Sequence, residues 1–197
     1  MSITNGYATL EQVKASARVE DNFDDALLEL AIEAASRQID QACERVFYNQ
    51  GTQARIFTPQ SHYLCEIDDL ISITKLETDP DGTTDFDIEF AAKDFQLEPL
   101  NGFAGGVERP FTHIRATDDY LFPMENGEAL VRVTGEWGFA STPTAITQAT
   151  VILASRIFKR NDSPLGVAGF GDIGVIRVGK MDPDVESLIN AWKKPRM

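Results

Sequence analysis

Apolar residues recur along residues 24–47 at the spacing of an α-helix. Successive steps of four, three, four, four and three residues align them in one stripe. The stripe consists of Leu28, Ile32, Ala35, Ile39, Cys43 and Val46. The segment contains no Gly or Pro and is rich in strong helix formers. The pattern predicts one long core helix, capped by Asn22 or Asp21, around which the rest of the chain is organised.

Three other segments begin with helix start signals, in which a capping residue is followed by a residue that favours the first turn. The pairs are Thr9 with Gln12, Thr142 with Pro143, and Asp182 with Pro183. They predict a short helix over residues 10–18, a second long helix over residues 143–160, and a last helix from residue 183 onward.

Between these helices the hydrophobic period changes from about 3.6 to two, which is typical of short strands separated by turns. The expected strands cover residues 55–58, 63–67, 71–77, 86–90, 95–97, 111–115 and 129–135. The fold class is therefore predicted as α+β. A mainly helical core of three to four helices, one of them long, is expected from residues 1–48 and 142–197. An antiparallel sheet or small barrel is expected from the insertion at residues 49–141.

Residues 161–180 form a glycine-rich loop in this interpretation, with a short run of alternating apolar residues. The run contains Ile173, Val175, Ile176 and Val178.

The charge of the chain is strongly negative and unevenly distributed. The net charge is −13, from 18 Lys and Arg against 31 Asp and Glu, so loose wrapping of the whole surface around nucleic acid is not expected. Residues 1–150 carry 10 basic and 26 acidic side chains, whereas residues 151–197 carry 8 and 5. Two basic clusters lie near the C-terminus: Arg156, Lys159 and Arg160, and Lys193, Lys194 and Arg196. These clusters are either solvated helix ends or contact sites for DNA phosphates or for an acidic protein surface, and an acidic protein partner is the preferred functional interpretation.

The sequence carries no strong signature of catalysis or of a bound cofactor or metal. Residues 169–174 match G-x-G-x-x-G but lack the preceding strand and following helix that dinucleotide binding requires. The acidic residues around Gly82 do not have EF-hand spacing, so a solvated hairpin turn is expected there. His62 and His113 have no second ligand at a suitable spacing. Scattered carboxylates still leave an acid and base pair open.

The two cysteines, Cys43 and Cys65, lie in apolar patterns and are expected to be reduced core residues of a protein that folds in the cytoplasm. The first residues do not resemble a signal peptide, and no apolar run reaches the length of about 18 residues needed to span a bilayer. No membrane partner is therefore expected.

Three segments together resemble the head-tail connector proteins of long-tailed bacteriophages, which are also called head-completion or adaptor proteins. The first is YATLEQVK at 7–14, followed by residues 24–48; the second is VRVTGEWGF at 131–139, running into residues 143–146. The third runs from FKR at 158–160 through the glycine-rich loop to DPDV at 182–185. The order and spacing of the segments carry the resemblance, since each alone has ordinary helix and turn chemistry. Known members are often shorter between the long helix and the Trp-Gly segment.

The resemblance implies a structural, non-enzymatic protein of the virion neck, made and assembled in the host cytoplasm. It implies a homo-oligomeric ring, usually of twelve subunits, below the portal protein. This ring would extend the channel for double-stranded DNA, without sequence-specific binding, and dock stopper or tail-completion proteins. No cofactor, metal or catalytic residue is implied.

Three sets of residues become candidates under this resemblance. The basic residues Arg156, Lys159, Arg160, Lys193, Lys194 and Arg196 are candidates for portal docking. The run Ile173, Val175, Ile176 and Val178 is a candidate for adding a strand to a neighbour. The residues Leu27, Leu30, Ala34 and Arg37 are candidates for the subunit interface. The alternatives are a tail-side completion protein, and an enzyme or ligand-binding domain with its pocket in the β-insertion.

Overall fold

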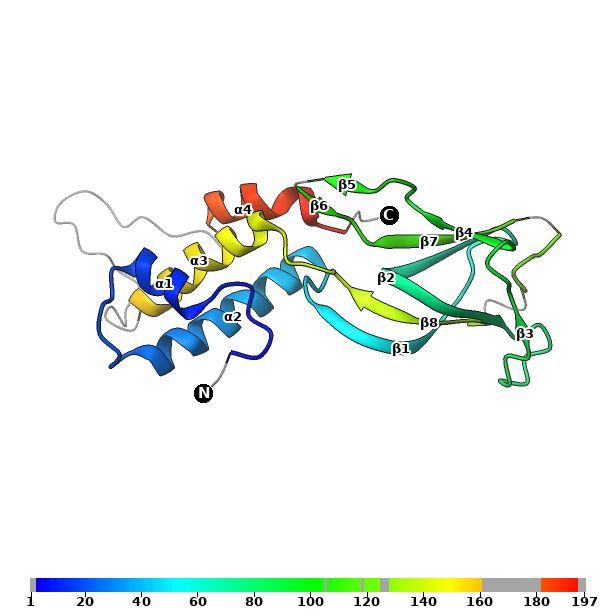
Figure 1. Cartoon of the computed structure of the whole chain (residues 1–197), viewed down its shortest axis with the longest axis horizontal. Coiled ribbons are helices and arrows are strands. Elements are labelled where there is room, and N and C mark those ends of the chain that lie inside the picture. The colour runs from blue at the N-terminus through cyan, green and yellow to red at the C-terminus, as the bar shows by residue number, and fades with distance from the viewer. Residues whose placement is uncertain (1–2, 105, 118, 125–127, 161–181, 195–197) are drawn as a thin grey trace. The chain divides into compact units, whose positions relative to one another are not determined.

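The computed structural model describes residues 3–104, 106–117, 119–124, 128–160 and 182–194 (Figure 1). The chain divides into two compact units, one formed by residues 1–47 with 142–197 and the other by residues 48–141. The first unit is helical and the second is built on an antiparallel sheet, so the predicted α+β class is confirmed.

The helical unit contains four α-helices and a short 3₁₀ helix within the described residues. They are α1 (Leu10–Ala17), α2 (Asp25–Cys43), α3 (Thr144–Lys159), α4 (Pro183–Ile189) and η1 (Asn190–Trp192). Helix α3 packs against α1, α2 and α4 (Figure 1). A shared core gathers one face of α2, including Leu28 and Ile32, with Val13 of α1 and Ala154 of α3.

Helix α2 begins and ends at slightly different residues from those predicted, because the backbone conformation at each end determines where the helix stops. Asp24 occupies the N-cap position, in place of the expected Asn22 or Asp21, and makes no side-chain capping bond. Glu44 adopts a left-handed conformation with φ of 55°, which ends the helix at Cys43.

The capping box between Thr9 and Gln12 is present at the start of α1 as predicted. At α3, Pro143 is the N-cap itself, so the helix begins at Thr144.

Within its described residues, the second unit contains a six-stranded antiparallel sheet and a small hairpin. The strands are β1 (Asn49–Phe57), β2 (Leu64–Thr78), β3 (Ile88–Glu89), β4 (Phe95–Glu98), β5 (Phe103–Ala104), β6 (Val107–Glu108), β7 (Phe111–Ala116) and β8 (Val131–Gly138). The strand order is β1-β8-β2-β7-β4, with β3 added on β2, while β5 and β6 pair with each other. The core of this unit contains Trp137, Leu70, Ile114 and Phe122, all fully buried.

Strand β2 is continuous across fifteen residues, although two separate strands were predicted there. Its first part pairs with β7 and its second part pairs with β8, with shifts of register near Leu70 and Ile73. The polar pair Asp68 and Asp69, which suggested a turn, lies inside this strand where the partner changes. Pairing with two different neighbours therefore overrides the local turn signal.

An ion pair links β2 to β8 on the side of the sheet that carries Glu77. Arg132 donates two hydrogen bonds to the nearly buried Glu77, at 2.7 and 2.8 Å, and Lys75 donates a third at 2.8 Å. The guanidinium of Arg132 also lies 4.6 Å from the ring centroid of Phe86. The hydrogen bonds from Arg132 and Lys75 outweigh desolvation and lower the pKa of Glu77 to about 2.

We expect this pair to make the stability of the sheet depend on pH. An unfolded Glu has a pKa of about 4.3, so the contribution of Glu77 is complete above that value. It is lost as the pH falls toward 2 and amounts to about 3 kcal/mol. Urea midpoints of the wild type and Glu77→Gln should therefore differ at pH 7 and converge at low pH. Parallel midpoint curves from pH 7 to pH 2 would contradict the assignment.

Candidate interaction surfaces

Residues 3–9 form an irregular arm that is hydrogen-bonded to α2. The carboxylate of Glu33 accepts hydrogen bonds from the backbone N–H groups of Thr4 (2.7 Å) and Asn5 (3.2 Å). The hydroxyl of Ser36 accepts a third from the N–H of Tyr7 at 3.1 Å. At Gly6, an added Cβ would lie 2.5 Å from a methyl group of Ile3, so the arm requires glycine there. These bonds hold the arm at a fixed place on the helix.

Tyr7 connects the arm to the end of α2 by its side chain. Its hydroxyl donates to Asp40 and accepts a hydrogen bond of 2.8 Å from the N–H of Phe47. Arg37 forms an ion pair with Asp40 at 2.9 Å and lies 5.5 Å from the ring centroid of Tyr7. Burial raises the pKa of Asp40, while the bonds from Tyr7 and Arg37 oppose that shift. These interactions fix the path of the chain where it leaves α2.

Replacing Tyr7 by phenylalanine is expected to destabilise the helical unit by about 1 to 3 kcal/mol, because the buried N–H of Phe47 loses its acceptor. Urea unfolding should report the loss, and hydrogen exchange of the Phe47 amide should accelerate. Thr9→Val, which removes an exposed capping bond at the start of α1, is a control that leaves this amide protected. Unchanged exchange at Phe47 in Tyr7→Phe would contradict the assigned bond.

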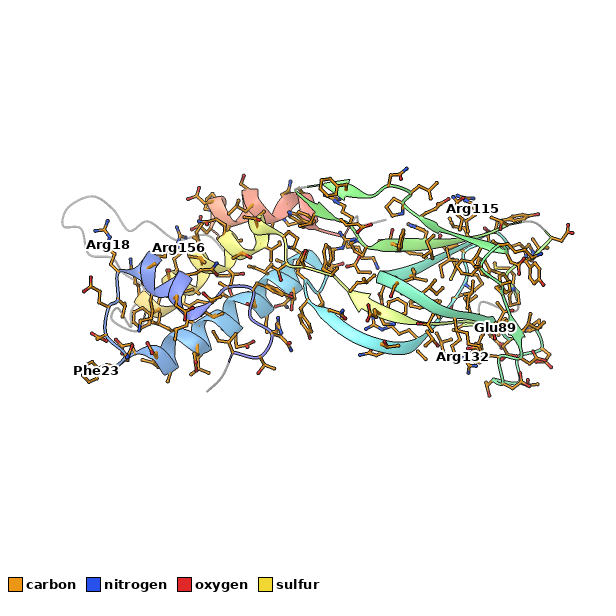
Figure 2. All side chains as sticks on the ribbon, in the orientation of Figure 1. Arg18, Phe23, Glu89, Arg115, Arg132 and Arg156 are labelled. Carbon is orange, nitrogen blue, oxygen red and sulfur yellow. The ribbon has the colours of Figure 1, made fainter. Side chains whose placement is uncertain are left out.

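An apolar stripe lies on the face of α2 opposite its buried face. Phe23, which precedes the helix, is 93% exposed, and Leu27 and Leu30 are 45% and 50% exposed. Ala34 is exposed on the next turn of the same face. Figure 2 shows Phe23 projecting away from the ribbon where the chain enters α2. We call Phe23, Leu27, Leu30 and Ala34 the outer stripe; its spacing of four, three and four residues is that of a helix-packing surface.

Arg37, which the sequence placed with this face, is about two-fifths exposed and belongs to the Tyr7 network. Its Nη2 donates to the carbonyl of Asn5 at 3.0 Å. The residue therefore joins the outer stripe to the arm.

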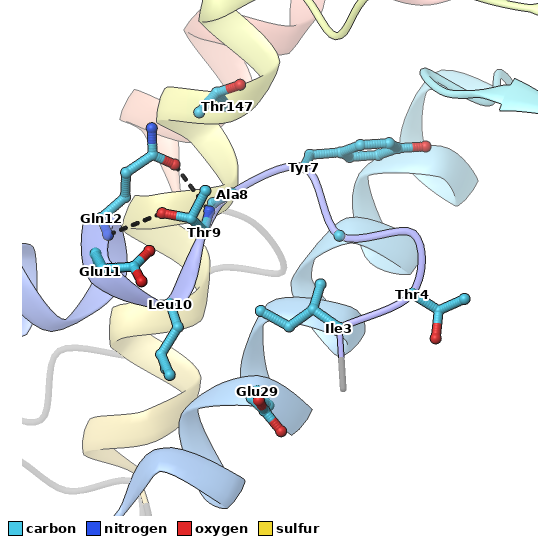
Figure 3. A pocket seen from close by; sticks show the side chains of 11 residues that line it. Ile3, Thr4, Tyr7, Ala8, Thr9, Leu10, Glu11, Gln12, Glu29 and Thr147 are labelled. Atoms are coloured by element: carbon cyan, nitrogen blue, oxygen red, sulfur yellow. Dashed lines mark hydrogen bonds between the residues drawn. The ribbon is translucent and has the colours of Figure 1, made fainter. Parts of the chain in front are cut away.

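An open groove of about 640 Å³ is lined by residues of the arm, α1, α2 and α3. It is lined by Ile3, Thr4, Gly6, Tyr7, Ala8, Thr9, Leu10, Glu11, Gln12, Glu29 and Thr147. In Figure 3, Ile3 of the arm and Leu10 of α1 point toward the same opening, next to Glu29 of α2. We call this surface the arm groove; it lies in the helical unit, although the enzyme alternative placed a pocket in the β-insertion.

The candidate docking cations of the helical unit differ in their surroundings. Arg156 forms an ion pair with the buried carboxylate of Asp182, the capping residue of α4. Lys193 lies 3.5 Å from Glu186, and the backbone N–H of Lys194 donates to the carbonyl of Cys43 at 2.9 Å. Lys159 and Arg160 are exposed at the end of α3. Arg196 lies outside the described residues.

The contact between Arg156 and Asp182 was not visible in the sequence. Because Asp182 caps α4, this contact ties α3 to α4 and gives Arg156 a structural role besides any docking role. The candidate strand-addition residues Ile173, Val175, Ile176 and Val178, the glycine-rich loop and the G-x-G-x-x-G segment all lie outside the described residues.

The acidic turn after β2 is more ordered than the sequence indicated. Asp79 is only 1% exposed, and its carboxylate accepts hydrogen bonds from the backbone N–H groups of Thr83 and Thr84. It therefore organises the turn, where a solvated carboxylate was expected. Within the described ranges, carboxylate oxygens of Asp79, Asp81 and Asp85 lie within 4.8 Å of one another.

The two histidines lie within hydrogen-bonding distance of other protein groups, and the two cysteines are buried. His62 Nδ1 lies 3.0 Å from the carbonyl oxygen of Phe122, and His113 Nδ1 lies 3.0 Å from the hydroxyl of Thr112. Cys43 and Cys65 are free and buried, and burial raises their pKa values to about 11 and about 12. Both thiols therefore remain protonated near neutral pH.

Among the residues that the structure describes, no helix is long and apolar enough to cross a membrane.

The fold of the whole chain is shared by chains in particles of gene transfer agents (GTA). One lies in the neck of an empty GTA particle with C6 symmetry; it is 18% identical, with a TM-score of 0.59, and the match covers 100% of this chain and 94% of that chain. A second, in the virion of a native GTA particle, is 18% identical with a TM-score of 0.57 and the same coverage. A third, in the neck of a native GTA particle with C12 symmetry, is 17% identical, with a TM-score of 0.55 and coverage of 100% and 97%. At these identities the likeness defines the fold.

Residues 7–95 match the model of a family described as phage gp6-like head-tail connector proteins. The match begins at Tyr7 of the arm, includes α1 and α2, and ends at the first residue of β4. It confirms the resemblance to head-tail connector proteins that the sequence indicated. No curated protein matches the chain significantly.

Proposed function

We propose that the protein is a structural head-tail connector of a phage or phage-like particle. It forms a homo-oligomeric ring in the neck, below the portal, where it extends the DNA channel and docks a stopper or tail protein. The observation that carries this proposal is the match of residues 7–95 to the head-tail connector family. The fold shared with neck chains of GTA particles supports it.

The outer stripe supports assembly with further copies of the chain. Soluble monomers rarely leave several large apolar side chains exposed along one helix face, and such patches commonly mark interaction sites. The C6 and C12 symmetries of the GTA necks support a ring, for which twelve copies is our proposed number. In a ring, each subunit uses two different surfaces in head-to-tail contacts that close.

The charge distribution fits a channel component with a basic docking end. The net charge of −13 disfavours tight binding of DNA phosphates, so DNA can pass an acidic wall without being held. Lys159 and Arg160 at the end of α3, together with Lys194, are the cations proposed to contact the portal. Arg156 and Lys193 add positive charge to the same unit while holding Asp182 and Glu186.

Recruitment to DNA-filled capsids that carry a portal but no tail tests this function. We expect saturable binding of about twelve copies per capsid, measured by co-sedimentation and quantitative mass spectrometry, and no binding to capsids that lack the portal. Saturable binding to isolated tails, with none to capsids, would contradict the portal-side position and favour a tail-side completion protein.

The docking cations are tested in the same assay by a graded charge series. Lys159→Gln with Arg160→Gln should weaken recruitment, and Lys159→Glu with Arg160→Glu should weaken it further, by at least about tenfold. Added salt should weaken wild-type recruitment in the same direction. Equal recruitment of the wild type and both variants would remove these residues from the docking site.

A further inference from the structure

The carboxylate of Asp182 is buried at the start of α4, and its two oxygens have different partners. Oδ1 accepts a hydrogen bond of 2.7 Å from the backbone N–H of Asp184 and so caps the helix. Oδ2 faces Arg156 of α3, which is the only partner of this oxygen within the described residues. The side chain of Asp182 is only 2% exposed, so the guanidinium of Arg156 compensates a charge that water hardly reaches.

Arg156 itself is open to solvent and belongs to the basic end of α3. Its side chain is 45% exposed, and Lys159 and Arg160, three and four residues further along the helix, are also exposed. Residues at these spacings share one face of a helix. The guanidinium that holds Asp182 therefore lies on the same helix face as the proposed docking cations, where an acidic partner can reach it.

Helix α4 depends on the rest of the helical unit for its order. It has only seven residues, which are too few for a stable isolated helix in water. Val185 is fully buried, and the ring of Trp192 in η1 packs edge-on against Phe47. The pair of Asp182 with Arg156 is the ionic part of this attachment, so loss of the arginine leaves an uncompensated buried charge where the helix begins.

We propose that Asp182 is an internal competitor for Arg156, so that docking of an acidic protein surface at the end of α3 and attachment of α4 oppose each other. In the free protein, Asp182 occupies the guanidinium. In the docked protein, a carboxylate of the partner replaces it, and the buried charge that is left loosens α4. This inference rests on the proposed docking of the basic residues. Because coupling between two equilibria is reciprocal, a change that frees Arg156 strengthens docking.

The second ion pair of α4 lacks the property that makes the first one a competitor. Lys193 lies 3.5 Å from Glu186, whose side chain is 58% exposed. Water solvates this carboxylate when the lysine leaves, so the pair holds neither the helix nor the lysine strongly. Glu186 therefore provides a matched control, with the same change of charge on the same helix.

Hydrogen exchange of residues 183–192 in the purified full-length protein tests the attachment. Arg156→Gln should speed exchange by at least about tenfold, because Asp182 stays buried without a cation. Adding Asp182→Asn should restore most of the protection, since asparagine keeps the capping oxygen and carries no charge. Glu186→Gln should leave exchange unchanged. Exchange as slow in Arg156→Gln as in the wild type would overturn the inference.

Recruitment to portal-bearing, DNA-filled, tailless capsids at limiting protein tests the competition. Asp182→Asn frees Arg156 and should strengthen recruitment by at least about fivefold. The gain should disappear when Arg156→Gln is added, and Glu186→Gln should give no comparable gain. Equal recruitment of Asp182→Asn and the wild type would overturn the competition. An equal gain in Asp182→Asn and Glu186→Gln would also overturn it, because it would show only a general effect of charge.

The outcomes separate this inference from the function on which it rests. Recruitment of the wild type with no gain in Asp182→Asn would overturn the competition and leave the connector function standing. Failure of the wild type to be recruited would overturn both, whatever the exchange experiment shows.

Discussion

Replacing Gly135 by valine is expected to destabilise the β-rich unit by at least about 3 kcal/mol. Gly135 lies in β8 opposite Ile73, where the register of β2 shifts. A Cβ at this position would lie 2.2 Å from the carbonyl oxygen of Ser72 and 3.2 Å from the Cα of Ile73. These two obstacles are backbone atoms, and the side chain of Leu70 lies 2.9 Å away, so the clash is relieved only by separating β2 from β8.

Urea unfolding and hydrogen exchange resolved by mass spectrometry measure the effect of Gly135→Val. Peptides from β2 and β8 should lose most of their protection. Thr134→Val, on the same strand and only partly buried, is the matched control and should change stability by less than about 1 kcal/mol. Equal unfolding midpoints for Gly135→Val and the wild type would contradict the strand pairing described here.

Introducing two glutamates at Leu27 and Leu30 is expected to abolish ring assembly without unfolding the monomer. Each leucine is about half exposed in the monomer, so the substitutions cost it little. In the proposed ring both side chains are buried, and each contributes about 1 to 2 kcal/mol that the variant loses. Two buried carboxylates without partners add a further penalty. Recruitment to portal-bearing capsids should therefore fall by at least about a hundredfold.

The control for this variant keeps apolar side chains of similar size. Leu27→Met with Leu30→Met should assemble almost as well as the wild type, since methionine retains most of the buried apolar surface. Circular dichroism and urea unfolding of the glutamate variant should match those of the wild type. A glutamate variant that is folded and still fully recruited would remove the outer stripe from the subunit interface.

Several parts of the fold could be predicted because they depend on neighbours in the sequence. The buried face of α2 follows from apolar residues at helical spacing, and the structure buries Leu28, Ile32 and Ile39 completely. The capping box of Thr9 and the cap at Asp182 are set within three residues, and both are present. Local chemistry of this kind can be interpreted from one sequence.

Other features depend on partners that are distant in the chain. Strand β2 passes its two aspartates without a turn because β7 and β8 pair with its two parts. Arg156 forms an ion pair with Asp182, and the buried carboxylate of Asp79 accepts hydrogen bonds from the backbone of the turn after β2. The need for glycine at position 135 arises from Ser72 on another strand. No periodicity or motif indicates such contacts.

The same distinction between local sequence signals and contacts of distant residues applies to the candidate surfaces. The sequence placed Leu27, Leu30 and Ala34 of the outer stripe on one helix face, but it did not indicate Phe23 or the arm groove, which three separate segments form. The arm, ITNGYAT at residues 3–9, has no periodic pattern of apolar residues. Its role depends on backbone bonds to Glu33 and Ser36, which lie more than twenty residues away.

Cryo-electron microscopy of portal-bearing, DNA-filled, tailless capsids incubated with the purified protein would show whether the chain forms a ring at the portal vertex. We expect a closed ring of this chain below the portal, with α2 of each copy at the contact between neighbours and the channel open along the axis. Capsids whose portal vertex carries no added density at saturating protein, or carries the chain only as isolated, non-contacting copies, would contradict it.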